Sequence, residues 1–117
     1  MKFFVPPLKT VFRLKQTWNF ELHYETRNET LWNLFSAIPM EGYFDRLYSQ
    51  RRRLRCDVCL SPDDELTVDR IFIRKGSNEY NSVTFRGKVK YNGVYHTVRF
   101  WVPLADVNGI EMEVIYR

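Results

Sequence analysis

The dipeptide Asn92-Gly93 constrains the fold of this chain more than any other feature, because it lies between two runs of alternating apolar residues. Asn-Gly favours a two-residue type I′ turn, whose twist matches that of the flanking strands. Such a turn fixes the register of a hairpin over residues 83–102 and divides its side chains between two faces. One face is almost wholly apolar and is predicted to join the core; it pairs Val83, Phe85, Gly87, Val89 and Tyr91 with Val102, Phe100, Val98, His96 and Val94.

The other hairpin face is basic and aromatic. The same register sets Arg86 directly opposite Arg99, and like charges at such positions repel. Two compensations are open: a neighbouring last strand that presents Glu111 and Glu113, or an anionic partner. The large ring of Trp101 needs a cover as well, either the N-terminal segment or a partner. The candidate partner-binding residues on this face are Arg86, Lys88, Arg99 and Trp101.

The length and composition indicate one domain, residues 1–117. Hydrophobic residues make up 44% of the 117, enough for a sizeable core, and the net charge of +4 is a mild basic excess. No apolar run reaches the roughly 20 residues that a membrane span needs, and no signal peptide is visible. We therefore expect a cytoplasmic protein without a membrane association.

The N-terminal half mixes strand and helix patterns. A short strand is expected at residues 10–14 and a half-buried strand at 17–25, where Trp18, Phe20, Leu22 and Tyr24 alternate. Helical spacing then predicts a helix within residues 26–37, with Asn28 as its cap, and a second helix within 41–50. This half, residues 1–50, is expected to pack on the C-terminal half.

The C-terminal half reads as a series of strands. Strands are expected at residues 53–60 and 66–74, then the hairpin, a compact turn at 103–109, and a last strand with Ile110, Met112, Val114 and Tyr116 inward. Leu66 and Val68 share a parity that Ile71 and Ile73 do not, and a β-bulge near Asp69-Arg70 would reconcile them.

The resulting fold class is mostly β with a minor α component. The strand entry at residues 64–68 and the turn at 103–108 ahead of Ile110 resemble those of SH3-like barrels, over little more than half the chain. The resemblance implies a small, partly closed antiparallel barrel of five strands from residues 53–117, with one or two short helices from the N-terminal half. Such barrels host many unrelated functions.

A second resemblance concerns origin. The run at residues 68–76, followed by Ser82-Val83-Thr84-Phe85-Arg86, is similar to segments of small accessory proteins of tailed bacteriophages. The resemblance implies a viral protein that acts in the host bacterial cytoplasm, and it brings no active site with it.

Catalysis and metal binding have little support. Only His23 and His96 titrate near neutral pH without a large pKa shift, and His96 is expected at the edge of the core. Cys56 and Cys59 form a lone C-x-x-C on a strand pattern, which places the two thiols on opposite faces: Cys56 toward the core and Cys59 outward. The acidic run at 63–65 is expected to be a solvated turn. We therefore predict no enzyme, no cofactor and no metal site.

The densest positive charge follows the second predicted helix. It comprises Arg51, Arg52, Arg53 and Arg55, and three aromatic residues lie just upstream: Tyr43, Phe44 and Tyr48. Arginine and tyrosine dominate the energetics of protein interfaces, and the same mixture binds phosphates and stacks bases. A solubilising edge that prevents strand pairing is the bland alternative.

Three functions follow from these features. The leading hypothesis is a non-enzymatic accessory protein that binds a host protein complex with an acidic surface. Binding is expected to modulate the complex by inhibiting it. The alternatives are direct binding of single- or double-stranded nucleic acid, and a structural component of a virion.

Overall fold

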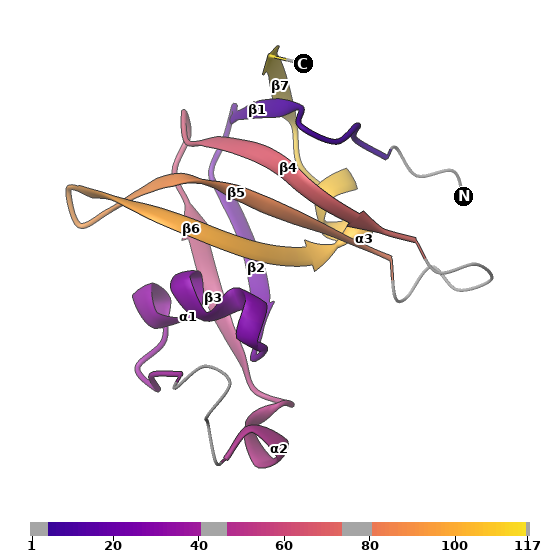
Figure 1. Cartoon of the computed structure of the whole chain (residues 1–117). Coiled ribbons are helices and arrows are strands. Elements are labelled where there is room, and N and C mark those ends of the chain that lie inside the picture. Colours follow the sequence, from indigo (N-terminus) through magenta and orange to yellow (C-terminus); the bar gives the residue numbers. More distant parts are fainter. Residues whose placement is uncertain (1–4, 41–46, 74–80, 117) are drawn as a thin grey trace.

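The structure is a computed structural model that describes residues 5–40, 47–73 and 81–116, and it is mostly β (Figure 1). The strands are β1 (Val11–Leu14), β2 (Trp18–His23), β3 (Arg55–Leu60), β4 (Glu65–Phe72), β5 (Ser82–Tyr91), β6 (Val94–Pro103) and β7 (Met112–Tyr116). The helices are all short: η1 (Thr26–Asn28), α1 (Glu29–Phe35), α2 (Tyr48–Arg51) and α3 (Leu104–Asn108). The predicted fold class is confirmed, and the main sheet does not close into a full barrel.

The β5–β6 hairpin has the register predicted from its turn. Asn92 and Gly93 both have positive φ, 51° and 80°, as a type I′ turn requires. Every predicted cross-strand pair is present, from Tyr91 opposite Val94 to Val83 opposite Val102. At the tip the apolar face ends, since Val94 is 58% exposed.

The main sheet differs in its strands from the barrel expected for residues 53–117. Its order is β6-β5-β4-β1-β7, so that β1 from the N-terminal half lies between β4 and β7. β3 leaves this sheet and pairs with β2, with Trp18 opposite Leu60 and Phe20 opposite Val58. This separate pairing lets both strands turn their apolar side chains toward the main sheet.

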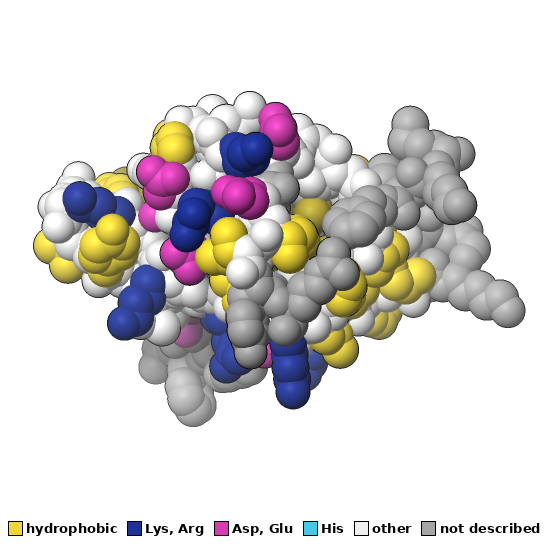
Figure 2. Space-filling model, turned by 90° about the horizontal axis from the view of Figure 1, so that it is seen from above, with side chains coloured by type: hydrophobic (Ala, Val, Ile, Leu, Met, Phe, Trp, Pro, Cys, Tyr) yellow, Lys and Arg dark blue, Asp and Glu magenta, His cyan; other side chains and the backbone are white. Residues whose placement is uncertain are grey.

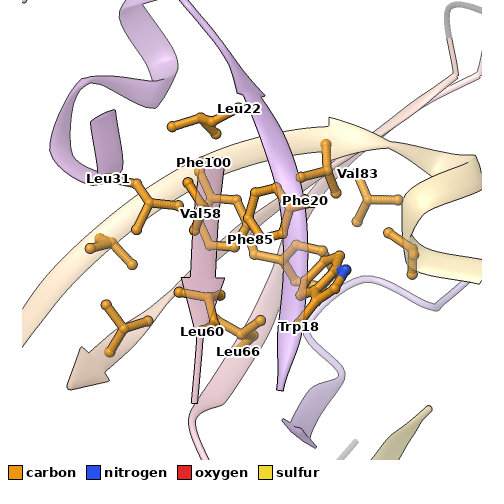
Figure 3. Packing of buried hydrophobic residues seen from close by; sticks show 14 of the residues in the cluster. Trp18, Phe20, Leu22, Leu31, Val58, Leu60, Leu66, Val83, Phe85 and Phe100 are labelled. Atoms are coloured by element: carbon orange, nitrogen blue, oxygen red, sulfur yellow. The ribbon is translucent and has the colours of Figure 1, made fainter. Parts of the chain in front are cut away.

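The core lies between the two sheets, which cross at a steep angle in Figure 1. Trp18 and Phe20 of β2 face Phe85 and Phe100 of the hairpin, and the Phe20 and Phe100 rings stack at 5.6 Å between centroids (Figure 3). The predicted alternation of β2 is confirmed, because Trp18, Phe20, Leu22 and Tyr24 are all buried. Away from its tip, the hairpin therefore buries its apolar face against β2.

The predicted β-bulge in β4 is also confirmed. The register of β4 against β5 shifts between Val68 and Arg70, so Asp69 is the extra residue. The bulge keeps Leu66, Val68 and Ile71 directed to the core despite their change of parity. β4 ends at Phe72, and Ile73 is half exposed.

The prediction that the last strand neighbours β6 is wrong. β7 pairs with β1 at the opposite edge of the sheet, and Glu113 lies opposite Arg13. Side chains of η1 and α1 occupy part of the β6 edge, which leaves no room for a strand there. On this outermost strand Val114 is 40% exposed, contrary to its predicted inward position.

The helix predicted within residues 26–37 is present as η1 and α1, and Asn28 occupies the N-cap position of α1. Its side chain does not cap, however. Asn28 is fully buried; its Nδ2 donates to the His23 carbonyl at 3.0 Å and its Oδ1 accepts from the Trp101 N–H at 2.7 Å. It joins β2 to the edge of β6. Of the helix predicted within 41–50, residues 41–46 lie outside the described part of the chain.

Candidate functional site

The predicted site residues form two separate surfaces. Arg51 ends α2, Arg52 and Arg53 follow it in a turn, and Arg55 begins β3. In Figure 1, α2 lies at the end of the molecule away from the main sheet. Arg86, Lys88, Arg99 and Trp101 lie on the outer face of the hairpin. We refer to residues 51–55 as the arginine turn.

The arginine turn is held in shape by its own backbone and by Arg55. The Arg55 guanidinium donates to the carbonyls of Arg52 at 3.1 Å and Leu54 at 2.8 Å. Cationic side chains at the end of a helix stabilise its unpaired carbonyls in this way. Arg52 and Arg53 are exposed, and neither forms an ion pair with a carboxylate in the described ranges. Two guanidinium groups that pair with no described carboxylate are therefore exposed to solvent.

Tyr48 connects the arginine turn to the core. It is half buried and packs against the buried Tyr24 ring, with 5.9 Å between centroids. Its ring therefore packs at the edge of the core and does not offer an exposed surface for stacking. Tyr43 and Phe44, the other aromatic residues expected near the arginines, lie outside the described residues.

The hairpin arginines share one carboxylate partner within the molecule. Asp69, the bulged residue of β4, forms an ion pair with Arg86 Nε at 3.2 Å and accepts a hydrogen bond from Arg99 Nε at 3.0 Å. One carboxylate thus bridges the two opposed cations. The acid that compensates them is Asp69 and not the predicted Glu111 and Glu113.

Replacing Asp69 with alanine should lower the free energy of unfolding by about 1 kcal/mol, because two partly exposed ion pairs are lost and two guanidinium groups then repel. In the D69A background, R99Q should lower the free energy of unfolding by less than it does in the wild type, since removing one cation relieves the repulsion. Urea denaturation measures both effects. D57A is the matched control, because the exposed Asp57 lies opposite Glu21 and should not destabilise the fold when removed. Equal costs of R99Q in both backgrounds would contradict the bridge.

The outer face of the main sheet is a mosaic of both charges. One row across the strands runs Glu113, Arg13, Glu65 and Lys88, from β7 to β5. The Arg13 and Glu65 side chains form an ion pair at 3.6 Å. Figure 2 shows acidic and basic side chains interspersed over this face. The face does not present one continuous basic surface.

Trp101 is covered by the N-terminal segment. The His23 ring lies 4.7 Å from it, the Arg27 guanidinium lies 5.5 Å from its ring centroid, and the Glu25 carboxylate accepts from its Nε1. Burial, and to a lesser extent the Arg55 charge, lower the pKa of His23, while Glu21 partly offsets them. Thr84, which faces Trp101 across the hairpin, is buried as a result.

The two cysteines lie as predicted, Cys56 half buried toward the core and Cys59 exposed. Burial, with a smaller contribution from Asp57, raises the pKa of the Cys56 thiol to about 11, so this thiol remains protonated at neutral pH. Within residues 5–40, 47–73 and 81–116, no cluster of His, Cys, Asp or Glu is arranged to hold a metal ion. His96 is half buried beside Tyr91, at the predicted core edge.

The acidic turn is not wholly solvated. Asp64 is 5% exposed, and its carboxylate accepts from the backbone N–H groups of Ser61 and Lys90, at 3.3 and 3.4 Å. It ties the β3–β4 turn to the hairpin. Desolvation raises the pKa of Asp64 against the opposing effect of these two hydrogen bonds.

We expect D64N to destabilise the fold by about 1–2 kcal/mol, because an amide offers only one acceptor to two N–H donors. The cost should shrink as the pH rises from acid to neutral. A raised folded-state pKa means that the folded protein binds more protons, so the wild type loses stability as the pH rises through that pKa. Denaturation at several pH values measures this, with D57N as the control on an exposed carboxylate outside this turn. A pH-independent cost would contradict the assignment.

The sequence did not reveal that Asp69, Asn28 and Thr30 form contacts with β6. Asp69 was detectable, because the parity change in β4 marks it as the bulged residue. Asn28 and Thr30 gave no such signal, since their partners lie about 70 positions away in β6.

No family model, curated protein or solved structure matches the chain. In the described part of the chain, every helix is too short to cross a membrane.

Proposed function

We propose that this chain is a non-enzymatic accessory protein of bacteriophage type, which binds an acidic surface of a host protein complex through the arginine turn and inhibits that complex. The supporting observation is the contrast between the two predicted basic surfaces. Asp69 forms ion pairs with both Arg86 and Arg99, whereas Arg52 and Arg53 are exposed without a carboxylate partner among the described residues.

An acidic protein fits the arginine turn better than a nucleic acid does. Sequence-tolerant binding of single strands relies on exposed aromatic rings on which the bases stack. The described aromatic residue at this turn, Tyr48, packs against Tyr24 instead. Two exposed arginines at consecutive positions suit carboxylates, each of which an arginine binds with two parallel hydrogen bonds.

The test is the charge-reversal pair R52E/R53E, compared with K9E/R70E, which changes the net charge equally at two other exposed residues. Tagged proteins are incubated with a bacterial lysate at physiological salt, and retained proteins are identified by mass spectrometry. We expect a protein that the wild type and K9E/R70E retain and that R52E/R53E loses. Exposed substitutions change stability by about 0.5 kcal/mol each, whereas losing an interface hot spot costs more than about 2 kcal/mol. Equal retention by all three proteins would refute the arginine turn as the contact.

Direct nucleic-acid binding is the second candidate, and it is favoured by a different surface. Tyr95 at the hairpin tip is 64% exposed and lies 5.9 Å below the Lys90 ammonium, beside Lys88. An exposed ring flanked by lysines is the arrangement that stacks a base and contacts phosphates. Gel shifts with single- and double-stranded DNA and RNA at about 50 and 200 mM salt test it, because counterion release makes such binding fall steeply with salt. No shift at the lower salt would exclude it.

A further inference from the structure

The outer edge of β6 is covered over only part of its length. The Thr30 hydroxyl accepts from the Arg99 N–H at 2.9 Å and donates to the Arg99 carbonyl at 3.1 Å, and Asn28 accepts from Trp101. These side chains take the place of a neighbouring strand. They protect the half of β6 that leads to α3.

The other half of this edge, toward the hairpin tip, is open. Backbone groups alternate in direction along a strand, so Tyr95 and Thr97 point the same way as Arg99 and Trp101. In the described ranges no residue hydrogen-bonds to these outward N–H and C=O groups of Tyr95 and Thr97. Unpaired groups on an exposed edge are a template for another strand.

The side chains at this open stretch favour contact with a partner. Val94 is 58% exposed and Tyr95 64%, and Thr97 is exposed too. Figure 2 shows hydrophobic and basic side chains together at the hairpin tip, on the left of the view. Free main-chain groups beside exposed apolar side chains are what strand addition uses, the first for affinity and the second for specificity.

The charge at the open edge selects an acidic partner. Lys88 and Lys90 lie opposite Thr97 and Tyr95, and neither forms an ion pair with a carboxylate in the part of the chain described. Glu65 lies opposite Lys88, but its carboxylate pairs with Arg13. β6 itself contains no acidic residue. A second copy of the chain would bring the lysines of two hairpins together, so self-pairing is disfavoured.

We propose that the open edge of β6, residues 94–97, accepts an extended acidic segment of a partner protein as an added strand. The segment bonds to the backbone of Tyr95 and Thr97. Its carboxylates lie toward Lys88 and Lys90, and its alternate apolar side chains pack beside Val94 on the other face. This site is independent of the arginine turn, and either one functions without the other.

The test uses a fluorescent synthetic peptide of alternating glutamate and valine, with binding measured by anisotropy. Proline at position 97 removes the outward N–H without breaking a bond to β5, because this N–H faces the edge. We expect T97P to weaken binding at least about tenfold, the effect of losing roughly 1.4 kcal/mol. T97V, which keeps the backbone donor, and R52E/R53E, which alters only the arginine turn, should bind like the wild type.

Two further measurements keep the test decisive if T97P does not fold. K88E/K90E should lose the acidic peptide and gain a peptide of alternating lysine and valine. In the wild type, amide hydrogen exchange at Tyr95 and Thr97 should slow when the acidic peptide is added.

Four outcomes would overturn the proposal. The first is that the wild type does not bind the acidic peptide. The second is that T97P binds the peptide as tightly as the wild type. The third is self-association that T97P abolishes, which would assign the edge to a second copy. The last is that a single-stranded oligonucleotide displaces the peptide and binds T97P as tightly as it binds the wild type. This result would make the hairpin tip a nucleic-acid-binding surface.

Discussion

Replacing Gly87 with alanine should lower the free energy of unfolding by about 3 kcal/mol, the upper range for overpacking a well-packed site. A Cβ at this position would lie 2.4 Å from the backbone oxygen of Glu65 and 3.2 Å from Leu66 Cδ2. The near atom belongs to the backbone of the adjacent strand, so no side-chain rotation relieves the clash. β4 and β5 would have to separate at the pair Leu66–Gly87, in the middle of the main sheet.

Gly109 provides a matched control for Gly87. A Cβ there would meet only ordinary contacts, at 3.5 and 3.6 Å, and φ is −87°. G109A should therefore change stability by no more than about 0.5 kcal/mol. Urea denaturation of both variants measures the difference. If G87A were as stable as G109A, the two strands would not be packed as closely as the structure shows.

Replacing Asn28 with alanine should cost about 3 kcal/mol. The substitution removes two hydrogen bonds and leaves the His23 carbonyl and the Trp101 N–H without partners at a buried position. Each orphaned buried group costs about 1–3 kcal/mol. The end of β2 would also lose its connection to β6, so the cover of Trp101 should loosen.

Two variants separate this role of Asn28 from a general loss of asparagine. N19A removes an exposed asparagine from β2 and should be nearly neutral. N28D keeps the shape but loses the donor to His23 and buries a charge, so it should be as damaging as N28A. Thermal denaturation gives the stability. Tryptophan fluorescence of the folded variants, measured with Trp18 and Trp32 replaced by phenylalanine, reports the surroundings of Trp101. A stable N28D would show that the His23 contact contributes little.

Local sequence determined the parts of the fold that depend on neighbouring residues. The Asn92-Gly93 turn set the whole register of the hairpin, because positive φ at two positions and the strand twist leave one favourable turn type. The change of parity around Asp69 located the bulge, and helical spacing located α1. The inward Cys56 and outward Cys59 follow from the same alternation along one strand.

Only the tertiary structure decided which strands are neighbours and which charges meet. The pairing of β3 with β2 and the insertion of β1 between β4 and β7 join segments distant in sequence, and the strand patterns of these segments are compatible with several partners. The same holds for the candidate site. Asp69 pairs with Arg86 and Arg99 because the bulge turns it toward the hairpin, whereas Arg52 and Arg53 form no ion pair with any described carboxylate. Whether two charges pair depends on the distance between them in the folded chain, and the periodicity of the sequence does not give that distance.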